Sequence, residues 1–283
     1  MAETTKSEQA VVAVSNKKDI GTQVIARVDN LMQVGFTMPA DYNHVNAIKA
    51  SMLVLNDLRN REGKTVFEAC TPASIQTALF EMATKGLDVS KKQAFFIMRG
   101  NKLCLDDSYF GKVLQVKRVF PNFDPRPRVV YAGDEFAFTT DPQTGRRSLV
   151  KHEQNLENID GDFVGAYLYI PCADGGQDLY IMTKKQILTA WSKSGDRNNT
   201  THKLFTDKMV GKTIINSACN MIINSTPSLS MAQSNEETPQ AEDADAEEVT
   251  EAEYVDVDTV EVTSADAEQK SSNIIVPDTN ADF

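Results

Sequence analysis

Gly211, Lys212 and Thr213 form the tripeptide that ends a phosphate-binding loop, so they raise the question of nucleotide binding. Such a loop needs an earlier glycine five positions before Gly211, because backbone N–H groups must surround the phosphates. That position is Thr206, and the preceding segment 202–209 is polar and lacks the β-branched run of a buried strand. The tripeptide alone therefore does not indicate a nucleotide-dependent enzyme, and Lys212 needs another explanation.

The cysteines and histidines suggest neither a catalytic centre nor a metal site. The chain has four cysteines and three histidines, which are scattered without the paired spacing of metal ligands. Reduced thiols, as in a cytosolic protein, are the expected state, and disulfide pairing is the alternative. We expect no catalytic residue, no metal and no cofactor.

Basic side chains form a pattern that suggests binding. In the last predicted helix, Lys208, Lys212 and Asn216 recur every four residues and share one face with Asn220. The adjoining face is apolar and suited to packing, with Leu204, Gly211, Ile215, Ala218 and Ile222. Further basic residues occur on two earlier helices and beside a hairpin turn: Lys112, Lys117, Arg118, Lys184, Lys185, Arg99 and Lys102. The recurrence favours a groove that binds a nucleic-acid backbone, and a set of solvated helix faces is the alternative.

The elements that would position these residues predict an α+β fold with an antiparallel sheet and a hairpin packed with helices. Periodicity and caps predict helices over 41–60, 71–86, 108–120, 183–195 and 202–227. Alternation and turn residues predict a hairpin over 93–107 and strands over 126–132, 135–140, 147–153, 162–172 and 177–183. Thr71 and Ser108 should cap their helices, Gly100-Asn101 should form the hairpin turn, and Asp134-Glu135 should lie in a turn between two strands.

Charge divides the chain into a body and a tail. The 283 residues carry a net charge of −11, but residues 231–283 hold 16 acidic residues and one lysine, and residues 1–230 are left with +4. We expect a flexible N-terminal extension over 1–30, one domain over 31–228 and a disordered acidic tail over 229–283. The polar N-terminus and the absence of a membrane-length apolar run predict a soluble, cytoplasmic protein.

Four sequence blocks, in this order, carry a resemblance to a known family. The blocks are 85–119, 129–138, 177–195 and 207–227. They resemble the RecT family of phage and prophage recombinases, over roughly residues 70–228. The matching positions are Gly86-Leu87, Tyr109, Gly111, Lys117-Arg118, Gly133 to Phe136, Met182 to Ile187, which is the best match, and Met209 to Thr213.

The resemblance implies an annealing core of the RecT or Red-beta type, working without ATP on single-stranded DNA and on the freshly annealed duplex. It also implies a homo-oligomer, as a ring or a helical filament, in the cytoplasm of a bacterial host. The implied partners are an exonuclease that makes the single strands and, as a further candidate, the host single-strand-binding protein. A passive single-strand-binding protein and a nucleotide-dependent enzyme are the rival functions.

The expected DNA-binding residues combine the basic pattern with the family blocks. Tyr109 would either stack on a base or pack in the core. The chain departs from the family pattern at four places: Gly211 replaces a lysine, Phe110 a basic residue and Ser108 a glycine, and His202 lies near a missing tryptophan. The expected site comprises Arg99, Lys102, Tyr109, Lys112, Lys117, Arg118, Lys184, Lys185, Lys208, Lys212 and Asn216.

Overall fold

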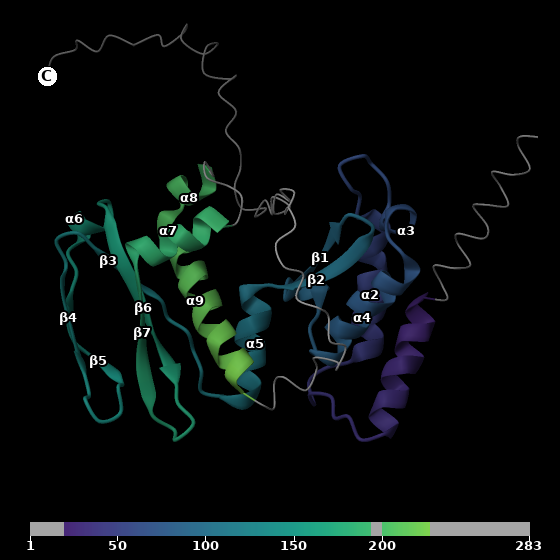
Figure 1. Cartoon of the computed structure of the whole chain (residues 1–283), viewed down its shortest axis with the longest axis horizontal. Helices are drawn as coiled ribbons and strands as arrows, with labels where there is room; N and C mark the ends of the chain where they lie inside the picture. Colours follow the sequence, from purple (N-terminus) through teal and green to yellow (C-terminus); the bar gives the residue numbers. More distant parts are fainter. Residues whose placement is uncertain (1–19, 194–199, 227–283) are drawn as a thin grey trace, which may run out of the picture. The chain divides into compact units, whose positions relative to one another are not determined.

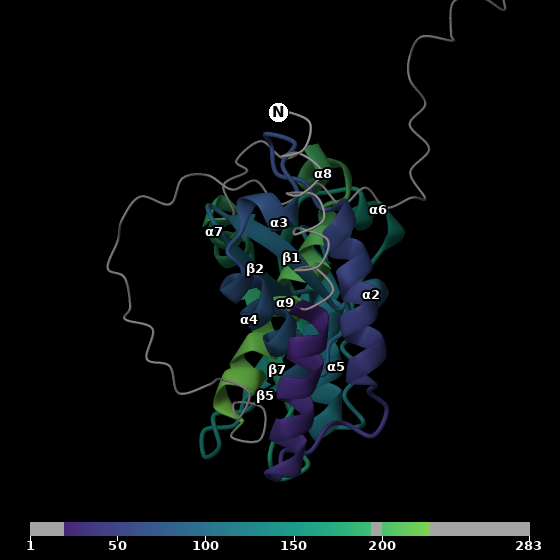
Figure 2. The same cartoon turned by 90° about the vertical axis from the view of Figure 1, so that its right-hand side faces the viewer.

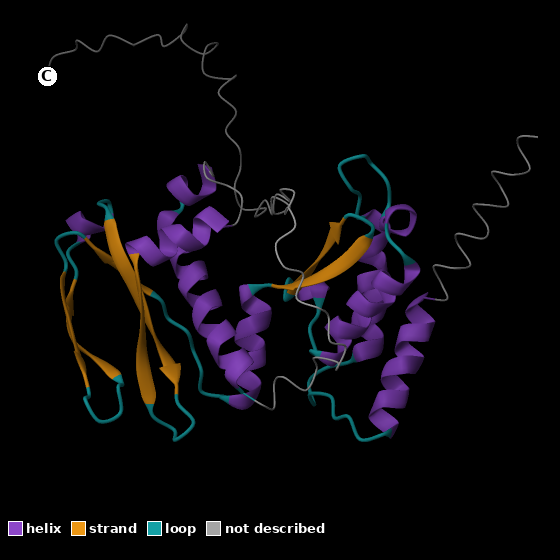
Figure 3. Ribbon diagram, in the orientation of Figure 1, coloured by secondary structure: helices purple, strands orange, loops and turns teal. Residues whose placement is uncertain are grey.

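The structure is a computed structural model in which residues 20–193 and 200–226 are described. It contains helices and antiparallel strands, which confirms the expected α+β class (Figure 1, Figure 3). Apolar side chains form two large hydrophobic clusters, one within residues 20–105 and the other within residues 116–222. The tail expected over residues 229–283 lies outside the described residues.

The first hydrophobic cluster joins helices to a hairpin. Its elements are the helix over 20–33, α2 (His44–Asp57), α3 (Val66–Ala69), α4 (Pro72–Thr84), the 3-10 helix η1 (Val89–Lys91), β1 (Ala94–Arg99) and β2 (Lys102–Asp107). The helix α4 begins as the sequence predicts, because the Thr71 side chain accepts a hydrogen bond from the Ser74 N–H and Pro72 fills the first turn. It ends before Gly86, whose φ of +64° favours glycine.

The helix over residues 20–33 corrects the expected N-terminal boundary. The flexible extension was expected to reach residue 30, yet Ile20, Val24 and Val28 are buried in the first cluster. Their four-residue spacing places them on one helix face, which packs beside α2 (Figure 2). The same stretch also contains Ile25, which packs against this cluster, so helical spacing was present in the sequence and was overlooked. Residues 1–19 lie outside the described residues.

The hairpin of β1 and β2 turns where it was expected. The pairing runs from Ala94 opposite Asp107 to Arg99 opposite Lys102, which leaves Gly100 and Asn101 as the turn. Gly100 has a φ of +59°, and Asn101 has no positive φ. The remaining strands are β3 (Arg128–Tyr131), β4 (Glu135–Thr140), β5 (Arg147–Glu153), β6 (Phe163–Pro171) and β7 (Gln177–Thr183).

These five strands form two antiparallel sheets, a three-stranded one in the order β3-β6-β7 and the hairpin β4-β5. On one face of β6, Leu168 packs in the second hydrophobic cluster. On the other face, Tyr167 packs with Phe136 of β4 and Leu149 of β5. The strands occur where they were predicted, but in separate sheets. The linker between β5 and β6 contains a short helix, α6 (Leu156–Ile159), which was not expected.

The other helices are α5 (Tyr109–Val119), α7 (Lys184–Lys193), α8 (Thr200–Leu204) and α9 (Thr206–Ser225). Ser108 caps α5 by accepting a hydrogen bond from the Gly111 N–H, as predicted. The helix α9 contacts α5, α7, α8 and the three-stranded sheet, so it is the central helix of the second cluster (Figure 1). The single helix predicted over 202–227 is divided at Phe205 into α8 and α9.

A buried carboxylate stabilises the turn between β3 and β4. It belongs to Asp134, which lies in a turn between two strands, as the sequence predicts. The Asp134 side chain is 0% exposed and accepts hydrogen bonds from the Tyr131 N–H, Gln154 and Asn158, each at 2.9 Å. The His152 ring lies 3.3 Å away. Burial alone would raise the pKa of Asp134, but these hydrogen bonds outweigh it and lower the pKa to about 2. The turn is therefore held by an ionised carboxylate.

Candidate nucleic-acid interface

The predicted polar face of α9 is present. Lys208, Lys212 and Asn220 are exposed and Asn216 is half-buried, and we call these four residues the α9 strip. The buried side of the helix includes Gly211, Ile215, Ala218 and Ile222, as the sequence indicates. Leu204 differs from the prediction: it is 69% exposed, because the helix breaks after it.

Gly211, Lys212 and Thr213 lie inside α9, so they form no phosphate-binding loop. A Cβ on Gly211 would lie 3.2 Å from Pro127 Cγ, which shows that this glycine serves close packing. The Thr213 hydroxyl donates to the Met209 carbonyl and accepts a hydrogen bond from the Trp191 indole, both at 2.8 Å. The interpretation of this tripeptide as a phosphate-binding loop is therefore wrong in geometry as well as in sequence.

The helix α7 begins directly after β7 and presents two lysines in its first turn. A reciprocal pair of hydrogen bonds starts it: the Thr183 N–H donates to Gln186 Oε1 at 2.9 Å, and the Gln186 N–H donates to Thr183 Oγ1 at 3.4 Å. This arrangement places Lys184 and Lys185 where the positive end of the helix dipole adds to their charge. Ile187 is fully buried and anchors the helix.

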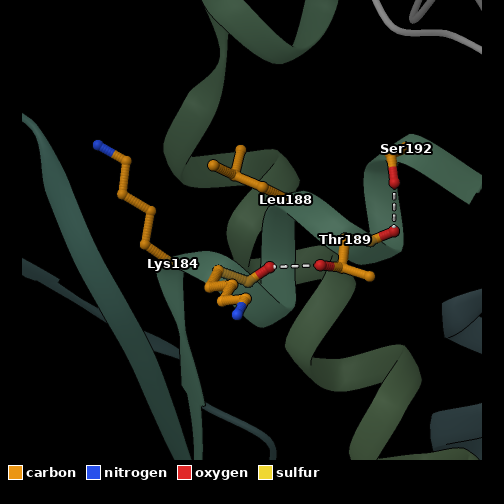
Figure 4. Close-up of a pocket in the computed structure, with 5 residues that line it drawn as sticks. Lys184, Leu188, Thr189 and Ser192 are labelled. Carbon is orange, nitrogen blue, oxygen red and sulfur yellow. Dashed lines mark hydrogen bonds between the residues drawn. The ribbon is translucent and has the colours of Figure 1, made fainter.

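The outer face of α7 lines a shallow hollow of about 550 Å³ (Figure 4). Two lysines stand at one end, and an apolar residue and two hydroxyls follow along the helix: Lys184, Lys185, Leu188, Thr189 and Ser192. The hydroxyl of Thr189 donates to the Lys185 carbonyl at 2.8 Å, and that of Ser192 to the Thr189 carbonyl at 2.9 Å. These bonds leave the hydroxyl oxygens able to accept.

Trp191 couples α7 to α8 and α9. Its indole N–H bonds Thr213 of α9, and its ring centroid lies 4.5 Å from that of His202 on α8. Since successive residues of a helix are about 100° apart, Lys212 and Asn216 lie on the arc between Thr213, which faces α7, and Cys219, which lies near Lys112 of α5. Lys212, Asn216 and Asn220 thus occupy the arc of α9 between its two neighbouring helices, and Lys208 lies just beyond Cys219.

The basic residues of α5 differ from one another in their surroundings. Arg118 is committed to the fold: its guanidinium donates to the carbonyls of Lys85 and Gly86, each at 2.7 Å, at the end of α4. Lys112 is half-buried, and burial lowers its pKa, although the nearby Asp107 opposes that shift. Lys117 is exposed.

The residues near the hairpin that were expected to bind DNA also differ from one another in their surroundings. Arg99 forms a salt bridge of 3.0 Å with Asp106, and Lys102 is exposed at the turn. Tyr109 is half-buried and packs against the second cluster, which agrees with the core alternative. Its neighbour Phe110 is 51% exposed, and the two ring centroids lie 3.9 Å apart. Phe110 is therefore the more accessible ring of this pair for stacking.

Asn216 adds an unusual group to the α9 strip. Its side-chain oxygen is buried and has no hydrogen-bond partner among the described residues. A buried acceptor without a donor costs about 1–3 kcal/mol, so a donor from a bound molecule or water would stabilise it.

Sequence reasoning overlooked part of this surface. Leu188 and Ser192 follow Lys184 at intervals of four residues, a spacing that could have indicated a shared face. Lys203 on α8 is exposed as well.

Other kinds of site are not found in the described part of the chain. Residues 20–193 and 200–226 contain no group of His, Cys, Asp and Glu side chains that could hold a metal ion. None of the helices described there is both long and apolar enough to cross a membrane. All four cysteines are free thiols, and Cys70 and Cys219 are buried, as expected for reduced residues.

Comparison with known proteins identifies the family. No curated protein matches the sequence significantly. The family model of the RecT family matches residues 46–252, which is well over half of the chain. The match includes every residue of the α9 strip and of the α7 hollow. The chain therefore belongs to the RecT family.

Proposed function

We propose that this protein pairs complementary single strands of DNA without nucleotide hydrolysis. Membership of the RecT family supports DNA binding and a role in recombination by single-strand annealing. The observation that carries the specific proposal is the set of exposed lysines on α7 and α9, coupled through Trp191 and Thr213. The helical position of Gly211 and Lys212 supports a mechanism independent of ATP.

Annealing requires little chemistry from the protein. Two DNA strands repel each other through their phosphates, so a surface that neutralises one backbone lowers the barrier to pairing. Lys185, Lys208 and Lys212 would hold phosphates, and Lys184 would join them by exchanging its partner Asp162, which lies 3.2 Å away. Bases that face away from this surface can then test an incoming strand.

Two other residues would contact bases. The Asn216 side-chain oxygen is buried, so its side chain would rotate to accept a hydrogen bond from a base amino group. Phe110 would stack on a base, and such stacking contributes about 1–3 kcal/mol per base. Arg118 is omitted from the proposed contacts, because its guanidinium is already bonded to two carbonyls.

An annealing assay tests the proposal. Two complementary oligonucleotides, labelled as a fluorescence donor and acceptor, are mixed with the full chain in the absence of nucleotide. We expect pairing to be faster than in the protein-free control and unchanged by ATP. Tight binding of single strands at the spontaneous pairing rate would instead identify a passive binding protein. ATP turnover above background would support the nucleotide-dependent enzyme.

The oligomer and the partners are part of the same proposal. Membership of the family supports oligomerisation. We infer a homo-oligomeric ring or helical filament, a partner exonuclease that supplies single strands, and contact with the host single-strand-binding protein in the bacterial cytoplasm. Mass measurement with and without DNA, and co-purification with an exonuclease encoded by the same phage or prophage, would test these inferences.

A further inference from the structure

Acidic residues are densest in one stretch after the last described helix. Residues 236–261 contain twelve acidic residues and no lysine or arginine. In contrast, residues 1–230 have a net charge of +4. A chain with this distribution holds a polyanion permanently attached to a weakly cationic body.

The helices α7 and α8 both contact α9, and all three helices carry exposed lysines, whose charge is opposite to that of the acidic stretch. Lys185 on α7, Lys203 on α8, and Lys208 and Lys212 on α9 are all exposed. Within the described residues, none of these four ammonium groups forms an ion pair, whereas Lys64, Lys85 and Lys151 elsewhere are each paired with carboxylates. We call these four residues the lysine face. No carboxylate of the described residues pairs with this charge, although the Lys208 ammonium lies 5.3 Å from the centroid of the Phe205 ring.

The stretch 236–261 can reach the lysine face. Along α9, Lys212 lies 13 residues before Ser225, which corresponds to about 20 Å at a rise of 1.5 Å per residue. The ten residues from 227 to 236 can span up to about 33 Å when extended. The connection is therefore long enough for the first acidic residues to return to Lys212, and later ones reach farther.

We propose that residues 236–261 bind the lysine face when DNA is absent and must be displaced when a strand binds. This inference rests on the proposed function, because it assigns the DNA and the acidic stretch to the same lysines. Tethering gives the stretch an effective concentration in the millimolar range, so even weak ion pairing competes with DNA. The competition favours long single strands, which offer many phosphates at once, over short or incidental polyanions.

The decisive comparison uses three full-length proteins. The first is the natural chain. The second carries Glu→Gln and Asp→Asn at the twelve acidic positions of 236–261, which keeps the length and removes the charge. The third, a matched control, has the residues of 236–261 in shuffled order, which keeps both length and charge. Affinity for oligo-deoxythymidine is measured by fluorescence anisotropy from low to high salt.

We expect the neutralised chain to bind at least about tenfold more tightly than the natural chain at low salt, with the gain disappearing as salt screens the tail. The shuffled chain should bind like the natural one. Equal affinity of all three proteins at low salt would overturn the proposal, and so would a shuffled chain that behaves like the neutralised one. A gain that is lost on dilution of the protein would also overturn it, because the tail would then act on a second copy.

A second measurement separates this inference from the proposed function. A fluorescent peptide of residues 236–261 is added to the neutralised full-length protein without DNA. We expect binding that weakens with salt and is reduced by Lys208→Gln with Lys212→Gln. Failure of the peptide to bind, in a protein that binds and anneals DNA, would overturn the tail inference alone. Peptide binding in a protein that does not bind DNA would overturn the proposed function instead.

Discussion

The helices α5 and α9 carry similar sets of basic residues, but two of the three on α5 have surroundings opposite to those of the lysines on α9. On α5, Arg118 donates to two backbone carbonyls and Lys112 is half-buried near Asp107. On α9, Lys208 and Lys212 are exposed and form no ion pair with any described residue. The availability of a cation thus depends on what its helix packs against, and helical spacing alone does not reveal this.

Among the substitutions that test this comparison, removal of the Arg118 side chain should have the largest effect on stability. Arg118→Ala leaves the carbonyls of Lys85 and Gly86 without their charged donors, so we expect the free energy of unfolding to fall by about 2–4 kcal/mol. Chemical denaturation measures the loss. Lys117→Ala, an exposed neighbour on α5, is the control and should change stability by less than about 0.5 kcal/mol. If the two variants were equally stable, Arg118 would contribute no more to folding than the exposed Lys117 does.

Removing lysines from α7 and α9 should affect binding without affecting stability. Lys185→Ala and Lys212→Ala should each weaken single-stranded DNA binding and flatten the dependence of log affinity on log salt by about 0.7. Thermal unfolding should be unchanged, since both side chains are exposed. Lys49→Ala, an exposed lysine on α2, serves as the control. Salt dependences identical to that of the natural chain would exclude these lysines from the interface.

Lys112 should show the smallest effect, and the size of that effect depends on pH. Burial lowers the pKa of Lys112, so its charge opposes folding at neutral pH and this cost disappears as pH rises towards the ordinary lysine range. Lys112→Met should therefore raise the free energy of unfolding at pH 7, by up to about 1 kcal/mol, with a smaller gain near pH 10.

Denaturation at the two pH values measures this gain, with Lys208→Met as the exposed control. If Lys112→Met gained less stability over the natural chain at pH 7 than at pH 10, the expected pH dependence would be wrong.

Much of the fold could be predicted because strong local signals mark its elements. Thr71, Ser108 and Gly100 lie where the sequence places two helix caps and a turn. The helix over 20–33 was missed although Ile20, Val24 and Val28 recur every four residues. The break at Phe205 and the separation of the strands into several sheets depend on tertiary packing, which periodicity does not contain.

The polar side of α9 could be predicted because it follows from helical spacing alone. The role of Arg118 could not, since its acceptors lie more than thirty residues earlier in the chain. The same holds for Tyr109 and Phe110: the sequence favours the tyrosine, but the docking of α5 buries that ring in part and exposes its neighbour. Long-range contacts decide which member of such a pair remains accessible.

The position of Trp191 has a consequence for spectroscopy. It is the single tryptophan of the chain, and its indole bonds Thr213 beside Lys212. Its emission therefore comes from one place, the junction of α7, α8 and α9, without background from other indoles. Any ligand that changes the polarity or packing at this junction should shift or quench the emission. The natural chain thus carries its own optical reporter of occupancy, and binding at this surface can be followed in real time without a dye.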